Sequence, residues 1–434
     1  MVIESKNTKK NNFAIIGTGI SGLSCGKLLN EKKIENTLFE KNNENGGLIS
    51  CSIEDGSLFH KVGGHVFNTK FKNVNSWFWK YFDLKNEFSL ADRNAAILIE
   101  GKLINYPIEL NLSKLSSKHQ KMIIFELIEL SSSNFKKKGT SNFQNFEEFL
   151  THNFGKTLYN LYFKKYNKKI WNKNLKDIPI DWLEGKLPMI KPEEIILKNI
   201  SASKNDNMVH SSFYYPKING SQFIVDRLSK GLNIKRSRVE KIDFYKNSIL
   251  INDYYQYKNL IYTGDVRNLI NLLDTRIINE LEINNLLKEI ELFESNGTTT
   301  VFCECDINDY SWIYIPDEEI KAHRIIMTGN FSKNNNSPNI PKKRITCTVE
   351  FTGKISLKIV NENLNKLPFN ISLLKYNFCQ SSYIIHNSKT RIKINELKSK
   401  LKSRNIFLCG RFAEWEYYNM DAAINSAMNI CKIF

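Results

Sequence analysis

The order of apolar and polar positions near the start of the chain predicts a strand, a glycine-rich turn, a helix and a second strand. Residues 13–16 form a short apolar run, residues 17–22 carry three glycines, and residues 23–29 have helical periodicity. A second apolar run at residues 37–39 ends at the acidic residue Glu40. This succession is typical of the first βαβ unit of a Rossmann-like domain.

The rest of the chain divides into helical and strand-like stretches. Apolar and aromatic residues recur at helical spacing between residues 74 and 92 and again from 115 to 170, which predicts helices. Residues 97–104 predict a hairpin, and strands resume after residue 210. Alternating runs between residues 298 and 385 predict an antiparallel sheet that roofs a substrate cleft. The last 30 residues predict a strand, a loop and a helix.

The glycine turn has the GxGxxG spacing of a dinucleotide-binding fingerprint. Gly17 permits a tight turn, Gly19 lets the backbone approach a pyrophosphate, and Gly22 lets the helix pack closely on the strand. The start of the helix offers free N–H groups to the anion. Glu40, 23 residues after Gly17, can accept hydrogen bonds from a ribose hydroxyl. A buried glycine turn without a ligand is the alternative, and the strand and helix around the motif disfavour it.

The composition is that of a globular protein with a surplus of positive charge. The 434 residues are 41% hydrophobic and 25% charged, and the formal net charge is +17. The lysines are scattered along the chain and no nucleic-acid-binding module is visible, so we expect no nucleic-acid partner. A positive field would still attract an anionic small substrate.

No segment of the sequence predicts secretion or membrane insertion. No window approaches 18 consecutive apolar residues, and the polar first 12 residues lack the apolar core of a secretory signal. The eight cysteines lack metal-ligand spacing, Cys303-x-Cys305 being the closest pair. We therefore expect reduced thiols, no metal site and a cytoplasmic location.

A second glycine pair carries a resemblance to the FAD-binding amine-oxidase superfamily. Gly46-Gly47-Leu48 follows Glu40 at the spacing of that superfamily, in which the chain runs along the FAD pyrophosphate at this point. The resemblance implies FAD as the cofactor. It also implies FAD contacts at Lys41, Gly47 and Leu48, at Val239 near the adenine, and at the turn Thr263-Gly264.

These features predict an α/β fold: a Rossmann-like FAD-binding domain with an inserted helical bundle and an antiparallel substrate domain. The FAD-binding domain is expected to comprise residues 1–73, 201–270 and 391–434. The helical insertion, with a mobile loop, is expected at 74–200 and the substrate sheet at 271–390.

Four further segments resemble the UDP-galactopyranose mutases and the related protoporphyrinogen-oxidase-like flavoproteins of surface-polysaccharide pathways. They are spread over nearly the whole chain: Gly64-His65-Val66-Phe67-Asn68-Thr69, the aromatic segment from Lys156 to Trp171, the strand with Arg324, and Gly410-Arg411 followed by Tyr417 to Asp421.

The resemblance implies a role for individual residues of these segments. Arg324, His65 and Lys186 are expected to be catalytic. The substrate would contact Tyr166, Trp171, Lys186, Arg324 and Tyr417. Further FAD contacts are expected at Gly64, His65, Gly410, Arg411, Asn419, Met420 and Asp421.

The reaction implied by the resemblance interconverts the pyranose and furanose forms of a nucleotide sugar without net oxidation. In the family, N5 of reduced FAD attacks the anomeric carbon and displaces the nucleoside diphosphate, after which the sugar opens and recloses. The partners expected are a nucleotide-diphosphate sugar, a reductant that is either NAD(P)H or a protein donor, and a second copy in a possible homodimer.

The sequence departs from the mutase pattern at several positions. Lys186 precedes the Leu187-Pro188 step where the family carries an arginine, which keeps the charge but loses the bidentate fork. Asn68 replaces a histidine, Phe351 a tyrosine and Asn419 an aspartate. An FAD-dependent oxidase or dehydrogenase and a non-enzymatic flavoprotein scaffold therefore stay open as alternatives.

Several candidate residues also have purely structural interpretations. Tyr166 and Trp171 are spaced like core residues of a helix, and His65 is of a type often found in cores. Arg324 could be an ordinary surface arginine, and Asp421 could only cap the last helix.

Overall fold

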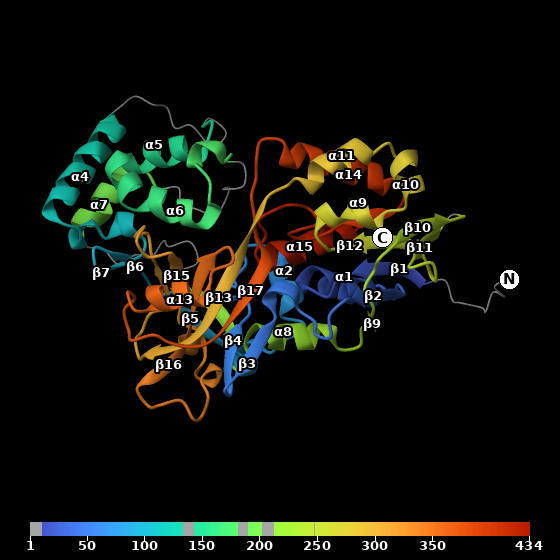
Figure 1. Ribbon diagram of the computed structural model, residues 1–434, viewed down its shortest axis with the longest axis horizontal. Helices are drawn as coiled ribbons and strands as arrows, with labels where there is room; N and C mark the ends of the chain where they lie inside the picture. Colours follow the sequence, from blue (N-terminus) through green and yellow to red (C-terminus); the bar gives the residue numbers. More distant parts are fainter. Residues whose placement is uncertain (1–10, 133–142, 181–189, 202–211, 247) are drawn as a thin grey trace.

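The computed structural model describes residues 11–132, 143–180, 190–201, 212–246 and 248–434. A seven-stranded sheet forms its first layer (Figure 1). The strand order is β10-β11-β12-β1-β2-β9, with β18 beside β12, and the central pairs β1–β2 and β1–β12 are parallel. The strands are β1 (Asn11–Ile16), β2 (Asn36–Glu40), β9 (Ile234–Arg236), β10 (Ile242–Tyr245), β11 (Ser248–Ile251), β12 (Tyr255–Tyr262) and β18 (Ile406–Leu408).

Helices cover both faces of this sheet, because the residues of β1 are apolar on both sides. Phe13 and Ile15 lie in one hydrophobic cluster, whereas Ala14 lies in another on the opposite face. The first face is covered by α1 (Ile20–Glu31), α2 (Lys72–Phe78), α8 (Gly220–Ser229) and α15 (Met420–Cys431). The second is covered by α9 (Leu269–Leu272), α10 (Thr275–Glu280), α11 (Asn284–Glu291) and α14 (Thr390–Lys402).

A second seven-stranded sheet has the order β17-β13-β16-β15-β14-β6-β7 and is mostly antiparallel, as the sequence predicts. Its apolar residues form a core with α13, and the short helix α12 follows β15. The elements are β6 (Ala95–Ile99), β7 (Lys102–Asn105), β13 (Ser295–Asp306), β14 (Trp312–Tyr314), β15 (Ala322–Ile326), α12 (Thr328–Phe331), β16 (Arg344–Thr352), α13 (Leu357–Leu364) and β17 (Ser372–Ile384).

The remaining helices gather at one end of the molecule, above the second sheet in Figure 1. Their aromatic and aliphatic residues form one hydrophobic cluster with β6. A π-helical turn at Tyr159–Phe163 joins α5 directly to α6. The helices are α4 (Ser117–Ser132), α5 (Phe146–Leu158), α6 (Lys164–Trp171) and α7 (Pro192–Ser201).

Two smaller sheets of two strands each complete the described fold. β3 (Cys51–Glu54) pairs with β4 (Ser57–His60), and β5 (Phe88–Asp92), which follows α3 (Leu84–Glu87), pairs with β8 (Ser212–Pro216). Among the described residues, no helix has the length and apolar character needed to cross a membrane.

The structure differs from the predicted segment boundaries in three places. The segment 74–200, predicted as the helical insertion, also contains the hairpin of β6 and β7. This hairpin belongs to the second sheet, because β6 pairs with β14. Residues 269–291 are helices packed on the first sheet, although the sequence places most of them with the substrate sheet. The helical spacing at 74–92 yields only short helices, and the chain becomes strand β5 at Phe88.

Candidate functional site

At two positions of the predicted fingerprint turn, the structure admits only glycine. Gly17 has φ +102°, and a Cβ there would lie 2.5 Å from Thr263 Oγ1. A Cβ on Gly22 would lie 2.0 Å from the carbonyl oxygen of Gly17. The turn is therefore pressed against both the start of α1 and the end of β12. Gly19 forms a β-bridge with Gly46, which joins the two glycine segments of the sequence.

Glu40 holds the fingerprint turn in place. One carboxylate oxygen accepts hydrogen bonds from the Thr18 backbone N–H at 3.0 Å and from its hydroxyl at 2.6 Å. The other oxygen accepts the Asn42 backbone N–H at 2.9 Å. Because an ionised carboxylate has about four acceptor positions, one remains for the predicted ribose contact.

The C-terminal segment closes over the same turn. Gly410 has φ +93°, and a Cβ there would lie 2.2 Å from Ser21 Oγ near the start of α1. Asn419 occupies the N-cap position of α15, where its side chain makes no capping hydrogen bond. Met420 is buried, and Asp421 lies in the first helical turn. The loop after β18 thus lies against the start of α1, and α15 packs on the same helix.

Two buried nitrogen atoms beside this segment have no hydrogen-bond partner. They are Nε2 of His65 and Nε of Arg411. Burial, then the nearby Arg411 and Arg324, lower the pKa of His65 to about 4. His65 is therefore a neutral imidazole at pH 7. Gly64 precedes it, and the backbone of Leu48 lies within hydrogen-bonding reach of its ring.

His60 and His65 should make the protein less stable as the pH falls below about 6.5, their ordinary pKa. Burial lowers the pKa of His60 to about 3 and that of His65 to about 4. Between pH 6.5 and 4 the unfolded chain therefore binds protons that the folded chain does not. Each histidine should reduce the free energy of unfolding by about 1.4 kcal/mol per pH unit.

Urea denaturation at pH 7.0, 6.0 and 5.0 measures this slope, in a range where carboxylates with ordinary pKa values remain ionised. His60→Gln should lower the slope by the contribution of one histidine. An unchanged slope in this variant would contradict the assignment.

The half-buried Arg324 and the fully buried Glu350 form an ion pair between neighbouring strands of the second sheet. Arg324 Nε donates to the Glu350 carboxylate, and one Nη donates to Tyr383 Oη at 2.9 Å. Glu350 also accepts the backbone N–H of Gly63 at 2.6 Å. Burial alone would raise the pKa of Glu350, but Arg324 and His323 lower it well below its usual range. The ionised carboxylate thus orients the guanidinium of Arg324.

Aromatic rings surround the end of Arg324. Tyr383 and Tyr417 are stacked with their ring centroids 5.9 Å apart. The guanidinium carbon of Arg411 lies 4.2 Å from the Tyr417 ring centroid, within cation–π distance. Trp171 packs edge-on against both tyrosines, at 5.8 Å from Tyr417 and 6.2 Å from Tyr383. The structure therefore brings four predicted site residues together around Tyr383: Arg324, Arg411, Trp171 and Tyr417.

The sequence left two interpretations open for Tyr166 and Trp171, as core residues of a helix or as substrate contacts, and their position in the structure is compatible with both. Both are buried in the hydrophobic cluster of the helical end, so they are core residues. Tyr166 also packs edge-on against Tyr314 of the second sheet at 5.3 Å. Their rings therefore lie where the helices meet the sheet that carries Arg324.

Lys169 fastens this helix to the second sheet. Its ammonium group donates to the backbone carbonyls of Ile315 at 2.8 Å, Ile320 at 2.5 Å and Ala322 at 3.2 Å, and it also contacts that of Asp317. All four carbonyls belong to the connection between β14 and β15 and to the start of β15. One side chain of α6 thus fixes the segment that leads into Arg324.

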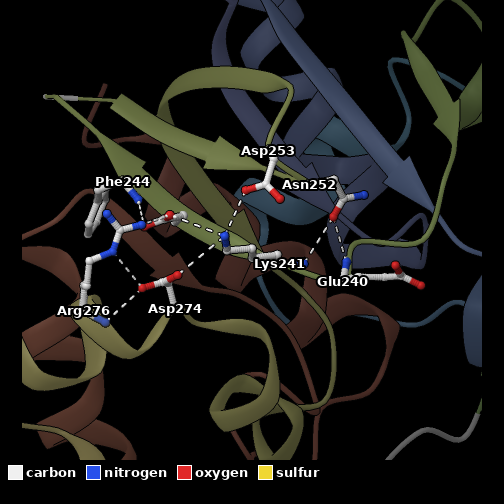
Figure 2. A network of polar contacts seen from close by, with 8 residues as sticks. Glu240, Lys241, Phe244, Asn252, Asp253, Asp274 and Arg276 are labelled. Carbon is white, nitrogen blue, oxygen red and sulfur yellow. Dashed lines mark hydrogen bonds and ion pairs between the residues drawn. The ribbon is translucent and has the colours of Figure 1, made fainter. Parts of the chain in front are cut away.

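Asn252, on the turn between β11 and β12, hydrogen-bonds to the backbone of Glu240 and Lys241, just after Val239 (Figure 2). The Asn252 amide oxygen accepts the backbone N–H of Glu240 at 2.8 Å and that of Lys241 at 3.2 Å. Its amide nitrogen donates to the carbonyl of Arg238 at 2.8 Å. These bonds clamp the backbone on both sides of Val239, which is buried against the first sheet.

A charged network holds the same region to α10, as Figure 2 shows. Lys241 lies 3.0 Å from Asp253, 3.6 Å from Asp274 and 3.7 Å from Asp243. Arg276 of α10 pairs with Asp274 and Asp243. The network joins β10, the β11–β12 turn and the helix into one unit.

The sequence indicates four further residues, two of them (Asn68 and Phe351) as departures from the mutase pattern. Lys186 lies outside the described residues. Lys41 is exposed, and the Asn68 amide donates to the Ser212 carbonyl at 2.5 Å. Phe351 is fully buried in the core of the second sheet.

Sequence reasoning missed two residues of the site, Glu350 and Tyr383. An acidic residue within the apolar run 345–351 was a signal for Glu350, because an unpaired carboxylate is rarely buried. Nothing local distinguishes Tyr383 from other strand tyrosines, since its importance comes from its neighbours in space.

The cysteines form no disulfide in the structure, and all eight are free thiols. Cys303 and Cys305 lie in the same hydrophobic cluster as Cys347 of the adjacent strand. The described residues hold no group of three or more His, Cys, Asp or Glu side chains suited to a metal ion.

Sequence comparisons relate the chain to dinucleotide-binding domains and to sugar mutases. Residues 15–83 match the family of NAD(P)-binding Rossmann-like domains. A UDP-galactopyranose mutase of Mycoplasma pneumoniae is 33% identical over 82 residues, which is 18% of this chain and 21% of that protein. A dTDP-fucopyranose mutase of Escherichia coli is 22% identical over 435 residues, 98% of each chain.

Solved structures show the same architecture over the whole chain. A reduced UDP-galactopyranose mutase superposes with a TM-score of 0.85 at 18% identity, covering 98% of this chain and 96% of the other. An oxidoreductase from Methanosarcina mazei superposes with a TM-score of 0.65 at 12% identity, covering 97% and 100%. The chain therefore has the fold of UDP-galactopyranose mutase, and the resemblance indicated by its motifs is confirmed.

Proposed function

We propose that this protein is a flavin-dependent nucleotide-sugar mutase, an isomerase that interconverts pyranose and furanose rings. The observation that carries the proposal is the convergence of Arg324 and Tyr417 on Tyr383, with Arg411 stacked on the same two tyrosines. This arrangement suits a diphosphate, because two cations and two phenols line one place. The names of the similar mutases support a nucleotide sugar as the substrate.

We infer that the dinucleotide held by the fingerprint turn is FAD. The unpartnered nitrogens of His65 and Arg411 suit a polar ring system that hydrogen-bonds at its edge. The crowding at Gly17 and Gly22 leaves backbone, rather than side chains, to face a pyrophosphate. When bound in its reduced form, FAD would supply a nucleophilic nitrogen to the anomeric carbon of the sugar.

Arg324 would stabilise the negative charge of the leaving nucleoside diphosphate. Its Nε and one Nη already point to Glu350 and Tyr383, so the guanidinium is oriented before the substrate binds. The second Nη donates to no other described residue and can reach an anion. Glu350 compensates part of the charge, and Arg411 adds a second cation beside it.

The aromatic residues would bind the parts of the substrate that do not react. Trp171 presents a flat ring beside Tyr417, suited to packing on a base or a sugar, and Tyr166 borders the same area. Tyr417 would donate a phenolic hydrogen bond to the diphosphate. Lys186 remains the predicted second cation of the loop before Leu187-Pro188.

His65 would act as a neutral group near the reacting carbon. Its lowered pKa keeps it uncharged at pH 7, so it adds no further positive charge beside Arg324 and Arg411. Its unpartnered Nε2 would instead hydrogen-bond to the edge of the flavin.

The proposal is tested with purified protein reduced by dithionite under anaerobic conditions. Incubation with UDP-galactose or dTDP-fucose in the furanose form should yield the pyranose isomer, measured by chromatography. The same sample oxidised by air should lose this activity. Borohydride trapping should leave sugar mass attached to the cofactor.

Either of two results would reject the mutase. One is the absence of isomer and adduct across a panel of UDP- and dTDP-linked sugars. The other is steady turnover of the oxidised protein with consumption of oxygen, which would favour the oxidase alternative. Protein without a flavin spectrum even after reconstitution would reject the cofactor as well.

Asn252→Ala should weaken FAD binding, because three hydrogen bonds around Val239 are lost and the adenine contact loosens. The loss of about 1.4 kcal/mol would raise the Kd about tenfold. Fluorescence titration of the deflavinated protein measures it. Asn252→Asp keeps the acceptor oxygen, so its Kd for FAD should lie between those of the wild-type protein and Asn252→Ala. Equal affinities for all three proteins would contradict an adenine contact at Val239.

A further inference from the structure

A second guanidinium lies on the face of the second sheet that carries Arg324. Arg93 comes just before β6, which pairs with β14. Tyr314 of β14 stands directly opposite Arg324 of β15, so the two side chains point to the same side of the sheet. One Nη of Arg93 donates a hydrogen bond to the hydroxyl of Tyr314. Tyr314 therefore lies beside both arginines.

Aromatic rings enclose the guanidinium of Arg93. Its central carbon lies 5.1 Å from the ring centroid of Tyr106, 5.3 Å from that of Trp312 and 6.0 Å from that of Tyr314. These distances allow cation–π contacts. Nε of Arg93 is buried and has no hydrogen-bond partner. The arginine is thus held by rings and a phenol rather than by an anion.

The positive charge of Arg93 has no described counter-charge. Arg324 is balanced by Glu350, whereas no ion pair joins Arg93 to a carboxylate among the described residues. Glu109 interacts with the neighbouring Tyr106, but burial raises the pKa of Glu109 to about 7. Because an arginine stays protonated and an uncompensated charge is unfavourable away from water, this arrangement favours the binding of an anion.

The contacts of Arg93 repeat those of Arg324. Arg324 donates to the hydroxyl of Tyr383. Arg93 donates in the same way to the hydroxyl of Tyr314. Each phenol accepts this bond and keeps its own hydrogen for a further acceptor. Tyr166 connects the two pairs, because it packs edge-on against Tyr314 at 5.3 Å and interacts electrostatically with Arg324.

We propose that Arg93 and Tyr314 bind a second anionic group of the nucleotide sugar, beside the phosphate at Arg324. This pair extends the substrate site of the proposed function, on which it depends. The group offers phosphate or carboxylate oxygens, because a guanidinium and a phenol both donate hydrogen bonds. A nucleotide sugar has two sources of such oxygens: the other phosphate of its diphosphate, and a carboxylate on an acidic sugar.

Calorimetric titration of Arg93→Met with UDP, UDP-galactose and UDP-galacturonate tests the proposal. Methionine occupies the space between the rings without a charge or a donor. The loss of hydrogen bonds from a charged group should raise the Kd about 10- to 100-fold. If Arg93 binds the second phosphate, the Kd rises for all three ligands. If it binds a sugar carboxylate, the Kd rises for UDP-galacturonate alone. Arg93→Lys keeps the charge, so its Kd values should lie between those of the wild-type protein and Arg93→Met.

Arg227→Met is the matched control. The guanidinium carbon of Arg227 also lies near two rings, at 5.6 Å from Phe82 and 5.1 Å from Phe223, but Arg227 pairs with Glu87. Its loss leaves that carboxylate without a partner, so Arg227→Met should lower the unfolding temperature and leave the three Kd values unchanged. Arg93→Met should do the opposite: its unfolding temperature stays near the wild-type value while the Kd rises.

Unchanged Kd values in Arg93→Met, with a wild-type protein that binds the ligands, would overturn this inference and leave the mutase proposal intact. A lower unfolding temperature in Arg93→Met without any change in Kd would likewise make Arg93 a purely structural residue. If the wild-type protein binds neither these ligands nor their dTDP counterparts, both proposals fail.

Discussion

Arg324→Lys should retain the fold and lose most of the nucleotide-sugar turnover. Lysine keeps a positive charge beside Glu350 but cannot donate at once to Glu350, Tyr383 and a diphosphate. The loss of a preorganised donor at a developing charge lowers kcat by about 100- to 1000-fold. Rates with reduced protein, measured under saturating nucleotide sugar, give the effect on kcat.

Arg324→Ala distinguishes the effect of Arg324 on turnover from its effect on the free energy of unfolding. Alanine leaves Glu350 buried without its partner, which should cost about 3 to 5 kcal/mol of unfolding free energy. The double variant Arg324→Ala/Glu350→Gln should recover part of this stability and none of the activity. Turnover near the wild-type rate in a folded Arg324→Lys would remove Arg324 from the reaction.

Lys169→Met should destabilise the protein and weaken substrate binding together. The methionine fills the space of the stem but leaves four carbonyl groups without the ammonium donor. Because hydrogen bonds from a charged group are worth about 1.5 to 3 kcal/mol, we expect a loss of about 3 kcal/mol. The KM for the nucleotide sugar should also rise, because Lys169 connects the helix that carries Trp171 to the start of strand β15, which carries Arg324.

Lys168→Met is the control for this experiment. Lys168 is the preceding residue of α6 and is exposed, so its loss removes the same charge from the same helix. Its unfolding free energy and its KM should be close to the wild-type values. If both lysine variants behave alike, the contacts of Lys169 do not connect the helix and the sheet energetically.

The parts of the fold that the sequence predicted are those specified by residues close together in the chain. The fingerprint turn is specified mainly by local geometry, because Gly17 has a positive φ and a Cβ on Gly22 would lie 2.0 Å from the carbonyl oxygen of Gly17. The hairpin of β6 and β7 follows from its turn, where Glu100 and Gly101 both have positive φ.

The long strand β17 could not be predicted from its own residues. It spans Ser372–Ile384, and only its last three residues are continuously buried. At the edge of the sheet its remaining side chains alternate weakly, so pairing with β13 imposes the extended conformation. Tyr383 lies in the buried end of this strand, where nothing in the sequence distinguishes it from other strand tyrosines.

The relation between Arg324 and Tyr417 was predicted only through the family resemblance. The two residues are 93 positions apart in the chain. Tyr383 connects them through a hydrogen bond on one side and a stacked ring on the other. Such convergence depends on the packing of two sheets, which periodicity does not encode.

The docking of Gly410 against Ser21 has a consequence for how the protein is made. The ribosome must synthesise nearly 400 further residues before β18 and the start of α15 can reach the turn that formed first. A nascent chain therefore presents an incomplete cradle throughout most of translation. Loading of the dinucleotide is accordingly a late step, coupled to the final closure of the polypeptide.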